Sequence, residues 1–83
     1  MNNAVPGIVS RIIDEYIRAA DLHPEWPSDP VHASAILNEE VGELTKAVLD
    51  WVYHGGDFAE LETEAIQVGA MVVRFLVNLE TVS

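Results

Sequence analysis

The chain is organised around a stretch that reads Asn38-Glu39-Glu40-Val41-Gly42-Glu43-Leu44. It lies in the segment 31–53, where apolar residues recur at the spacing of an α-helix, about 100° per residue. The apolar arc of this helix contains Ala33, Ile36, Leu37, Val41, Leu44, Ala47, Val48 and Trp51. Glu40 points into the middle of the arc and Glu43 lies at its edge, where a packing helix would carry apolar side chains.

A later segment repeats this placement of a carboxylate among apolar side chains. Its apolar stripe contains Leu61, Ala65, Val68, Met71, Val72, Phe75, Leu76 and Leu79. Glu64 shares the stripe, because it precedes Val68 by four residues and Met71 by seven. We therefore expect Glu40 and Glu64 to meet between two neighbouring helices.

A carboxylate in an apolar contact has to be neutralised, paired or bound to a metal ion, because burying a bare charge costs several kcal/mol. Pairing partners are scarce, since the basic residues are one lysine, Lys46, and three arginines, Arg11, Arg18 and Arg74. The sequence therefore predicts a divalent cation. Oxygen ligands in a chain without cysteine favour Mg²⁺, with Mn²⁺ as the alternative, over Zn²⁺.

The length of 83 residues predicts one small domain spanning 1–83. A chain of this size buries only about 60% of the surface that its unfolded form exposes. Because 49% of the residues are nevertheless hydrophobic, apolar surface is left over. We expect part of it to be buried against another copy of the chain, in a homodimer or a homotetramer.

The formal net charge of −10 argues against nucleic acid and anionic membranes as partners, because four basic residues cannot form a cationic patch. A phosphorylated small molecule remains compatible with this charge if metal ions bridge its phosphates to the carboxylates. The sequence has no uncharged run of membrane-spanning length, and it does not begin with the basic start of a signal peptide. We therefore expect a cytoplasmic protein.

The first of three predicted helices begins with Pro6 in its first turn and runs through Ala20, after a frayed end at 1–4. Prolines at positions 24, 27 and 30 then forbid a regular helix and give the following loop a fixed shape. In this loop, Trp26 either pins the loop onto the helices or, with His23, forms a wall for a planar ligand such as a base.

The second predicted helix begins with Asp29 as its cap and Pro30 in its first turn. It ends at about His54, before the two glycines at 55–56. The histidine is expected to interact with the carboxyl end of this helix.

The third predicted helix is capped by Asp57, with Glu60 completing a capping box, and runs to about 79–80. Gly42 and Gly69 lie inside predicted helices, where a close approach between helices would explain them. No segment alternates like a strand, so the sequence predicts an all-α fold. Three helices enclose a poor core alone, and we expect dimerisation to complete a four-helix bundle.

Simpler interpretations remain for several polar residues. Glu39 suits a solvated helix face, whereas Glu40 and Glu64 do not. His32 lies near the start of the second helix. It either has a functional role, by supporting a metal ligand or touching a phosphate, or is only a partly exposed residue at a helix start. Neither His32 nor His54 follows a glutamate by three residues, as a di-iron carboxylate bundle requires. The sequence also lacks a nucleophile with its base and acid, and a glycine-rich phosphate loop.

The acidic residues form the pattern Glu39-Glu40-x-x-Glu43, then twenty residues, then Glu64-x-x-Gln67. This pattern resembles that of the MazG-like, all-α nucleoside triphosphate pyrophosphohydrolases, which is Glu-Glu-x-x-Glu, a spacer and Glu-x-x-Asp. The run 64–71, together with His32 and Ile36 before the first motif, looks especially like small phage and bacterial members. The resemblance covers about 31–79.

The resemblance implies hydrolysis of a nucleoside triphosphate between the α and β phosphates, giving monophosphate and pyrophosphate. Glu40, Glu43 and Glu64 would hold magnesium, with Gln67 at the remaining ligand position. Glu39 would orient or deprotonate water. The residues that could touch the substrate are Lys46, Arg18 or Arg74 as a positive contact to the phosphates, together with Trp26 and His32.

Gln67 is a departure from the family pattern, because it stands where the family has aspartate. An amide oxygen can bind Mg²⁺ but carries no charge, so one metal site should be weaker and activity reduced or lost. Two other functions therefore stay open: a non-catalytic helical interaction module that keeps the fold, and a metal-stabilised structural dimer without a nucleotide.

Overall fold

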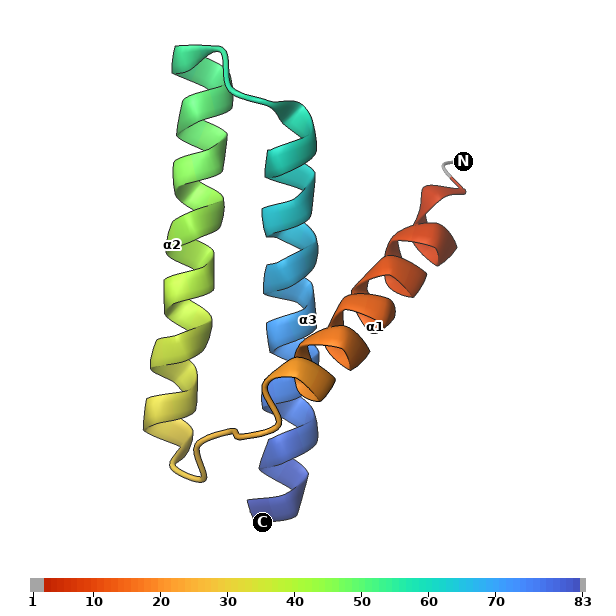
Figure 1. Cartoon of the computed structure of the whole chain (residues 1–83), viewed down its shortest axis with the longest axis vertical. Helices are drawn as coiled ribbons and strands as arrows, with labels where there is room; N and C mark the ends of the chain where they lie inside the picture. Colours follow the sequence, from red (N-terminus) through yellow and green to blue (C-terminus); the bar gives the residue numbers. More distant parts are fainter. Residues whose placement is uncertain (1–2, 83) are drawn as a thin grey trace.

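The structure is a computed structural model that describes residues 3–82. It contains three helices, α1 (Ala4–Leu22), α2 (Pro30–His54) and α3 (Phe58–Val82), and no strand within the described residues. The all-α prediction is confirmed. Figure 1 shows α2 and α3 as an antiparallel pair, with α1 crossing α3 obliquely so that its amino-terminal half diverges from the pair. None of the described helices combines the length and apolar content needed to cross a membrane.

The boundaries of α2 follow from the capping residues that the sequence supplies. Asp29 accepts a hydrogen bond from the backbone N–H of Val31 at 2.9 Å, and Pro30 is the first helical residue. At the other end, Gly55 has a φ of 68° and the N–H of Gly56 donates to the carbonyl of Asp50 at 2.9 Å. Both predicted ends of α2 are confirmed.

The start of α3 is also confirmed, because Asp57 accepts a hydrogen bond from the N–H of Ala59 at 2.9 Å. Its end is not: the helix continues to Val82, past the predicted end at 79–80. Pro6 lies in the first turn of α1, as predicted, but the helix already includes Ala4, which was expected to belong to the frayed end. Asn3 makes no side-chain capping bond there, so no capping pattern marked this end in the sequence. The rest of the predicted frayed end, at 1–2, lies outside the described residues.

The helix α3 is central, because α1 and α2 both pack against it, whereas the backbones of α1 and α2 do not approach each other closely in the described part of the chain. Small residues make this close packing feasible. Ala70 is fully buried, and a Cβ added at Gly69 would lie 2.9 Å from Cδ1 of Ile12 in α1. The close helix approach predicted for Gly69 is therefore confirmed. Gly42 is exposed, and a Cβ there would meet no described atom within 4 Å.

A buried arginine joins the end of α1 and the following loop to α3. Arg74 is 5% exposed, and its guanidinium donates to the carbonyls of Ala19 at 3.5 Å, of Glu25 at 3.3 Å and of His23. The same guanidinium lies 4.8 Å from the ring centroid of Trp26. Trp26 therefore helps to pin the loop onto the helices, as one of its two predicted roles requires.

The two helical glycines give a matched test of this packing. Gly42→Ala should raise the free energy of unfolding by about 0.5–1 kcal/mol, because alanine has the higher helix propensity. Gly69→Ala should gain less or lose stability, because its Cβ would press on Ile12. Urea denaturation at one protein concentration, followed by circular dichroism, measures both. An equal gain at the two positions would contradict the close contact.

Removing the guanidinium should loosen the loop. Arg74→Met should lower the free energy of unfolding by about 1.5–3 kcal/mol, because the hydrogen bonds that the charged guanidinium donates to three carbonyls are lost. Arg11→Met is the control, since Arg11 makes an exposed 3.6 Å ion pair with Glu62, worth at most about 1 kcal/mol. The same urea titrations compare the two variants. A similar loss of unfolding free energy in both would contradict a stabilising role for the buried Arg74 contacts.

Candidate functional site

Glu40 lies at the centre of a cluster of carboxylates drawn from all three helices. Its side chain is half-buried on α2. Partial burial raises the pKa of Glu40 above its usual value, and the negative charges of Glu64, Glu43, Glu39 and Glu15 raise that pKa further. Glu64 contributes from α3 and Glu15 from α1. The helices thus bring like charges close enough to repel one another.

A pocket of about 360 Å³ lies beside this cluster, between the three helices and the loop after α1. Glu40 and Gln67 both line it, so α2 and α3 contribute one predicted ligand each. Glu15 and Arg18 line the pocket from α1, and Trp26 lines it from the loop. The pocket therefore combines an acidic wall with an aromatic one.

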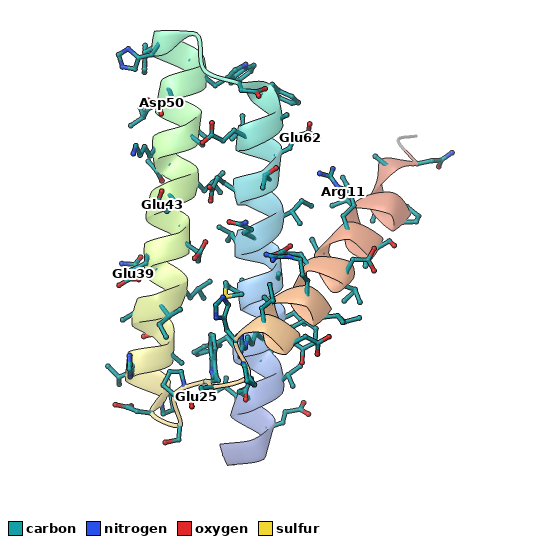
Figure 2. The ribbon with its side chains drawn as sticks, in the orientation of Figure 1. Arg11, Glu25, Glu39, Glu43, Asp50 and Glu62 are labelled. Carbon is teal, nitrogen blue, oxygen red and sulfur yellow. The ribbon has the colours of Figure 1, made fainter. Side chains whose placement is uncertain are left out.

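The other two predicted ligands, Glu43 and Glu64, line a separate hollow of about 90 Å³ together with Lys46. The four predicted ligands are thus distributed over two hollows, joined by the electrostatic coupling of Glu64 to Glu40. Figure 2 shows Glu39 and Glu43 succeeding one another along α2, followed by Asp50. Glu39 is exposed, as the predicted water-facing position requires.

The cluster is not a preformed cage for an ion. No group of three acidic or histidine side chains in the described residues has the arrangement of a metal site. The donor set nevertheless suits a hard cation, because it consists of carboxylate and amide oxygens with unrelieved mutual repulsion. Binding Mg²⁺ would require Glu40, Glu43 and Glu64 to turn toward one point, with Gln67 as a neutral oxygen donor.

The proposed substrate contacts are placed unequally. Lys46 lies in the smaller hollow beside two predicted ligands, and half-buried Trp26 lines the larger pocket. His32 is exposed near the start of α2 and lines neither of these two hollows. Arg74 borders the larger pocket, but its guanidinium is directed at main-chain carbonyls. This leaves Arg18 and Lys46 as the better placed cations.

Glu15, on α1, was not among the residues that the sequence pointed to. The guanidinium of Arg18 donates to both carboxylate oxygens of Glu15, at 2.8 and 2.6 Å. This hydrogen bonding lowers the pKa of Glu15. The three-residue spacing of the pair was visible in the sequence, but its position facing α2 across the pocket depends on how α1 crosses α3.

The chain matches no family model, no curated protein and no solved structure. The resemblance to the MazG-like family accordingly stands on the sequence motifs alone.

The dependence of the melting temperature on pH should reveal the electrostatic repulsion between Glu40 and the neighbouring carboxylates. Because its pKa is raised in the folded chain, the folded state holds the proton more tightly, and ionised Glu40 destabilises the fold at neutral pH. Glu40→Gln should therefore raise the melting temperature at pH 7. This advantage should disappear as the pH falls below the ordinary glutamate pKa, where the wild-type side chain is also neutral. Thermal melts across pH measure the difference, with exposed Glu62→Gln as the control. A gain that persists in acid would contradict the electrostatic origin.

Proposed function

We propose that this chain is a Mg²⁺-dependent nucleoside triphosphate pyrophosphohydrolase of the MazG-like type, producing a nucleoside monophosphate and pyrophosphate. One observation carries the proposal: half-buried Glu40 is repelled by carboxylates from its own helix and from both others. A divalent cation relieves that repulsion, and the motif resemblance connects such a cation to triphosphate hydrolysis.

Each residue of the motif has a role in this proposal. Glu40, Glu43 and Glu64 hold the metal, and Gln67 adds an uncharged oxygen. Mg²⁺, when bound, neutralises the triphosphate and stabilises charge on its phosphoryl oxygens. Exposed Glu39 accepts a proton from the attacking water. The bond between the α-phosphorus and the bridging oxygen to the β-phosphate breaks, so the elements of water are divided between the two products.

The larger pocket is the proposed place for the nucleoside. Trp26 offers part of its ring as a wall, and Arg18 lines the same pocket with its charge partly offset by Glu15. Lys46, in the hollow beside Glu43 and Glu64, is the proposed contact to the phosphates. His32 remains a more distant candidate for the same role. The chain would work in the cytoplasm, as a homodimer or homotetramer whose four-helix centre is built from two copies.

The second candidate is a non-catalytic helical interaction module with the same fold. Gln67 favours it, because this residue replaces the charged ligand of the family motif and leaves one ion position without its full negative charge. Both candidates share Mg²⁺ binding at the remaining carboxylates, so turnover separates them.

Magnesium should stabilise the wild-type chain. At a free concentration one hundred times the dissociation constant, the expected gain is about 2.7 kcal/mol for one site. Glu40→Gln and Glu64→Gln should lose most of this gain, whereas Glu62→Gln, exposed on α3, should keep it. Melts with and without Mg²⁺ test the metal site separately from catalysis. An equal Mg²⁺-dependent shift of the melting temperature in the wild type and all three variants would contradict the proposed metal site.

Pyrophosphate release across a panel of ribo- and deoxyribonucleoside triphosphates tests the reaction. Glu39→Gln should reduce kcat by about 10²–10⁴-fold, the usual contribution of a general base, while the Mg²⁺-dependent rise in melting temperature is retained. Gln67→Asp should bind Mg²⁺ more tightly and turn over faster. If the wild-type chain releases no pyrophosphate and Gln67→Asp gains Mg²⁺ affinity without turnover, the interaction module is the better description.

A further inference from the structure

The helix α2 carries a charged row and an apolar row on opposite sides. Counting about 100° per residue from Val31, Glu39, Glu43 and Asp50 fall at about 80–120°. An apolar row, Val41, Val48 and Val52, falls at about 260–300° by the same count. The residues that pack on α3 lie between these rows, and Ala33 is the most buried of them.

The other two helices are divided in the same way. On α3, Gln67 and Arg74 lie about 180° from the row formed by Val72 and Leu76. On α1, a charged row and an apolar row are again about 180° apart. The charged row there contains Arg11, Glu15 and Arg18, and the apolar row contains Val9, Ile13 and Ile17.

The polar rows of α1 and α3 line the same two adjoining pockets. From α2, Ile36 and Glu40 line the larger of these pockets, and Ile36 lies next to the charged row of α2 by the same count. The apolar rows are therefore left together on the other side. We call this surface the apolar face, and it consists of Val9, Ile13, Ile17, Val41, Val48, Val52, Val72 and Leu76. These side chains are between 37% and 56% exposed. Counting about 100° per residue places no charged residue within the three apolar rows.

The chain exposes more surface than a monomer of its mass should. The accessible surface is 5881 Å², whereas the scaling law for folded monomers gives about 4,900 Å² at 9.1 kDa. The surplus of roughly 1,000 Å² is close to the area of about 800 Å² that each partner buries in a stable interface. Among the described residues, the buried hydrophobic side chains are all alanines, Ala19, Ala33 and Ala70. One apolar interface of ordinary size would therefore supply the large buried side chains that the single chain lacks.

We propose that a second copy of this chain packs on the apolar face, so that two α2–α3 pairs form a four-helix core and both acidic sites face outward. A second copy fits because a two-fold interface requires one surface to complement itself, and rows of valine and leucine at helical spacing can interdigitate. Pairing through the charged side would instead bring two acidic clusters together. This inference specifies the interface of the proposed oligomer and does not depend on hydrolysis.

Adjacent residues on α2 provide a matched test. Val48, 37% exposed, belongs to the apolar face, whereas Leu49, 48% exposed, points about 100° away from it. Sedimentation velocity across the micromolar range should show dimers for the wild type and Leu49→Glu, and folded monomers for Val48→Glu. A monomeric wild type, a dimeric Val48→Glu, or equal dissociation of both variants would overturn the proposal.

If Val48→Glu fails to fold, crosslinking decides the question. The chain has no cysteine, so single-cysteine variants report on one position each. A flexible bismaleimide should join two copies of Leu76→Cys, on the apolar face, much faster than two copies of Leu49→Cys. The reverse order would place the interface elsewhere, and equal slow rates would indicate a monomer. Pyrophosphate release does not enter either measurement, so a failed interface and a failed enzymatic proposal give distinct results.

Discussion

The buried guanidinium of Arg74 is the contact on which the arrangement of the site depends. It comes from the central helix and binds carbonyls at the end of α1 and in the loop that follows. The carboxyl end of a helix is the negative end of its dipole, so a cation there is favourable as well as hydrogen-bonded. Without this contact, nothing of comparable strength among the described interactions would join the loop to α3. The aromatic wall of the larger pocket and the position of Glu15 both follow from it.

Among the described residues, the buried positive charge of Arg74 serves this structural purpose, and neither of the two ion pairs reaches Glu40. Arg18 is paired with Glu15, and Arg11 with Glu62 at the molecular surface. Glu40 thus remains repelled on several sides while partly withdrawn from water. Such a cluster weakens the isolated fold, and the proposed cation would offset that loss of stability. Under that proposal, the stability of the chain would depend on metal binding.

Much of the fold was predictable because its signals are local. Asp29 with Pro30 and the glycines at 55–56 specify the ends of α2 through hydrogen bonds that span only a few residues. The proximity of Glu40 and Glu64 was also predictable, because two helical periods place both on surfaces that have to pack. Ala4 was expected to be frayed although it is helical, because Asn3 provides no side-chain cap that would mark the start of α1.

The parts of the site that escaped prediction all depend on contacts between residues distant in the chain. Arg74 and the carbonyls it binds are separated by about fifty residues. The helical periodicity of the sequence does not predict hydrogen bonds between segments so far apart. Glu15 faces the pocket only because of the angle at which α1 crosses α3. Gly69 and Gly42 look alike in the sequence, yet among the described residues Gly69 meets a neighbouring helix and Gly42 does not.

Because Arg74 donates its hydrogen bonds to main-chain oxygens in the loop, these bonds do not depend on which side chains the loop residues carry. His23 and Glu25 can be exchanged for other residues while their carbonyls stay in place. Both also line the larger pocket. The anchoring of the loop and the chemistry of its inner surface are therefore separable, and selection could remodel the second while the first stays intact.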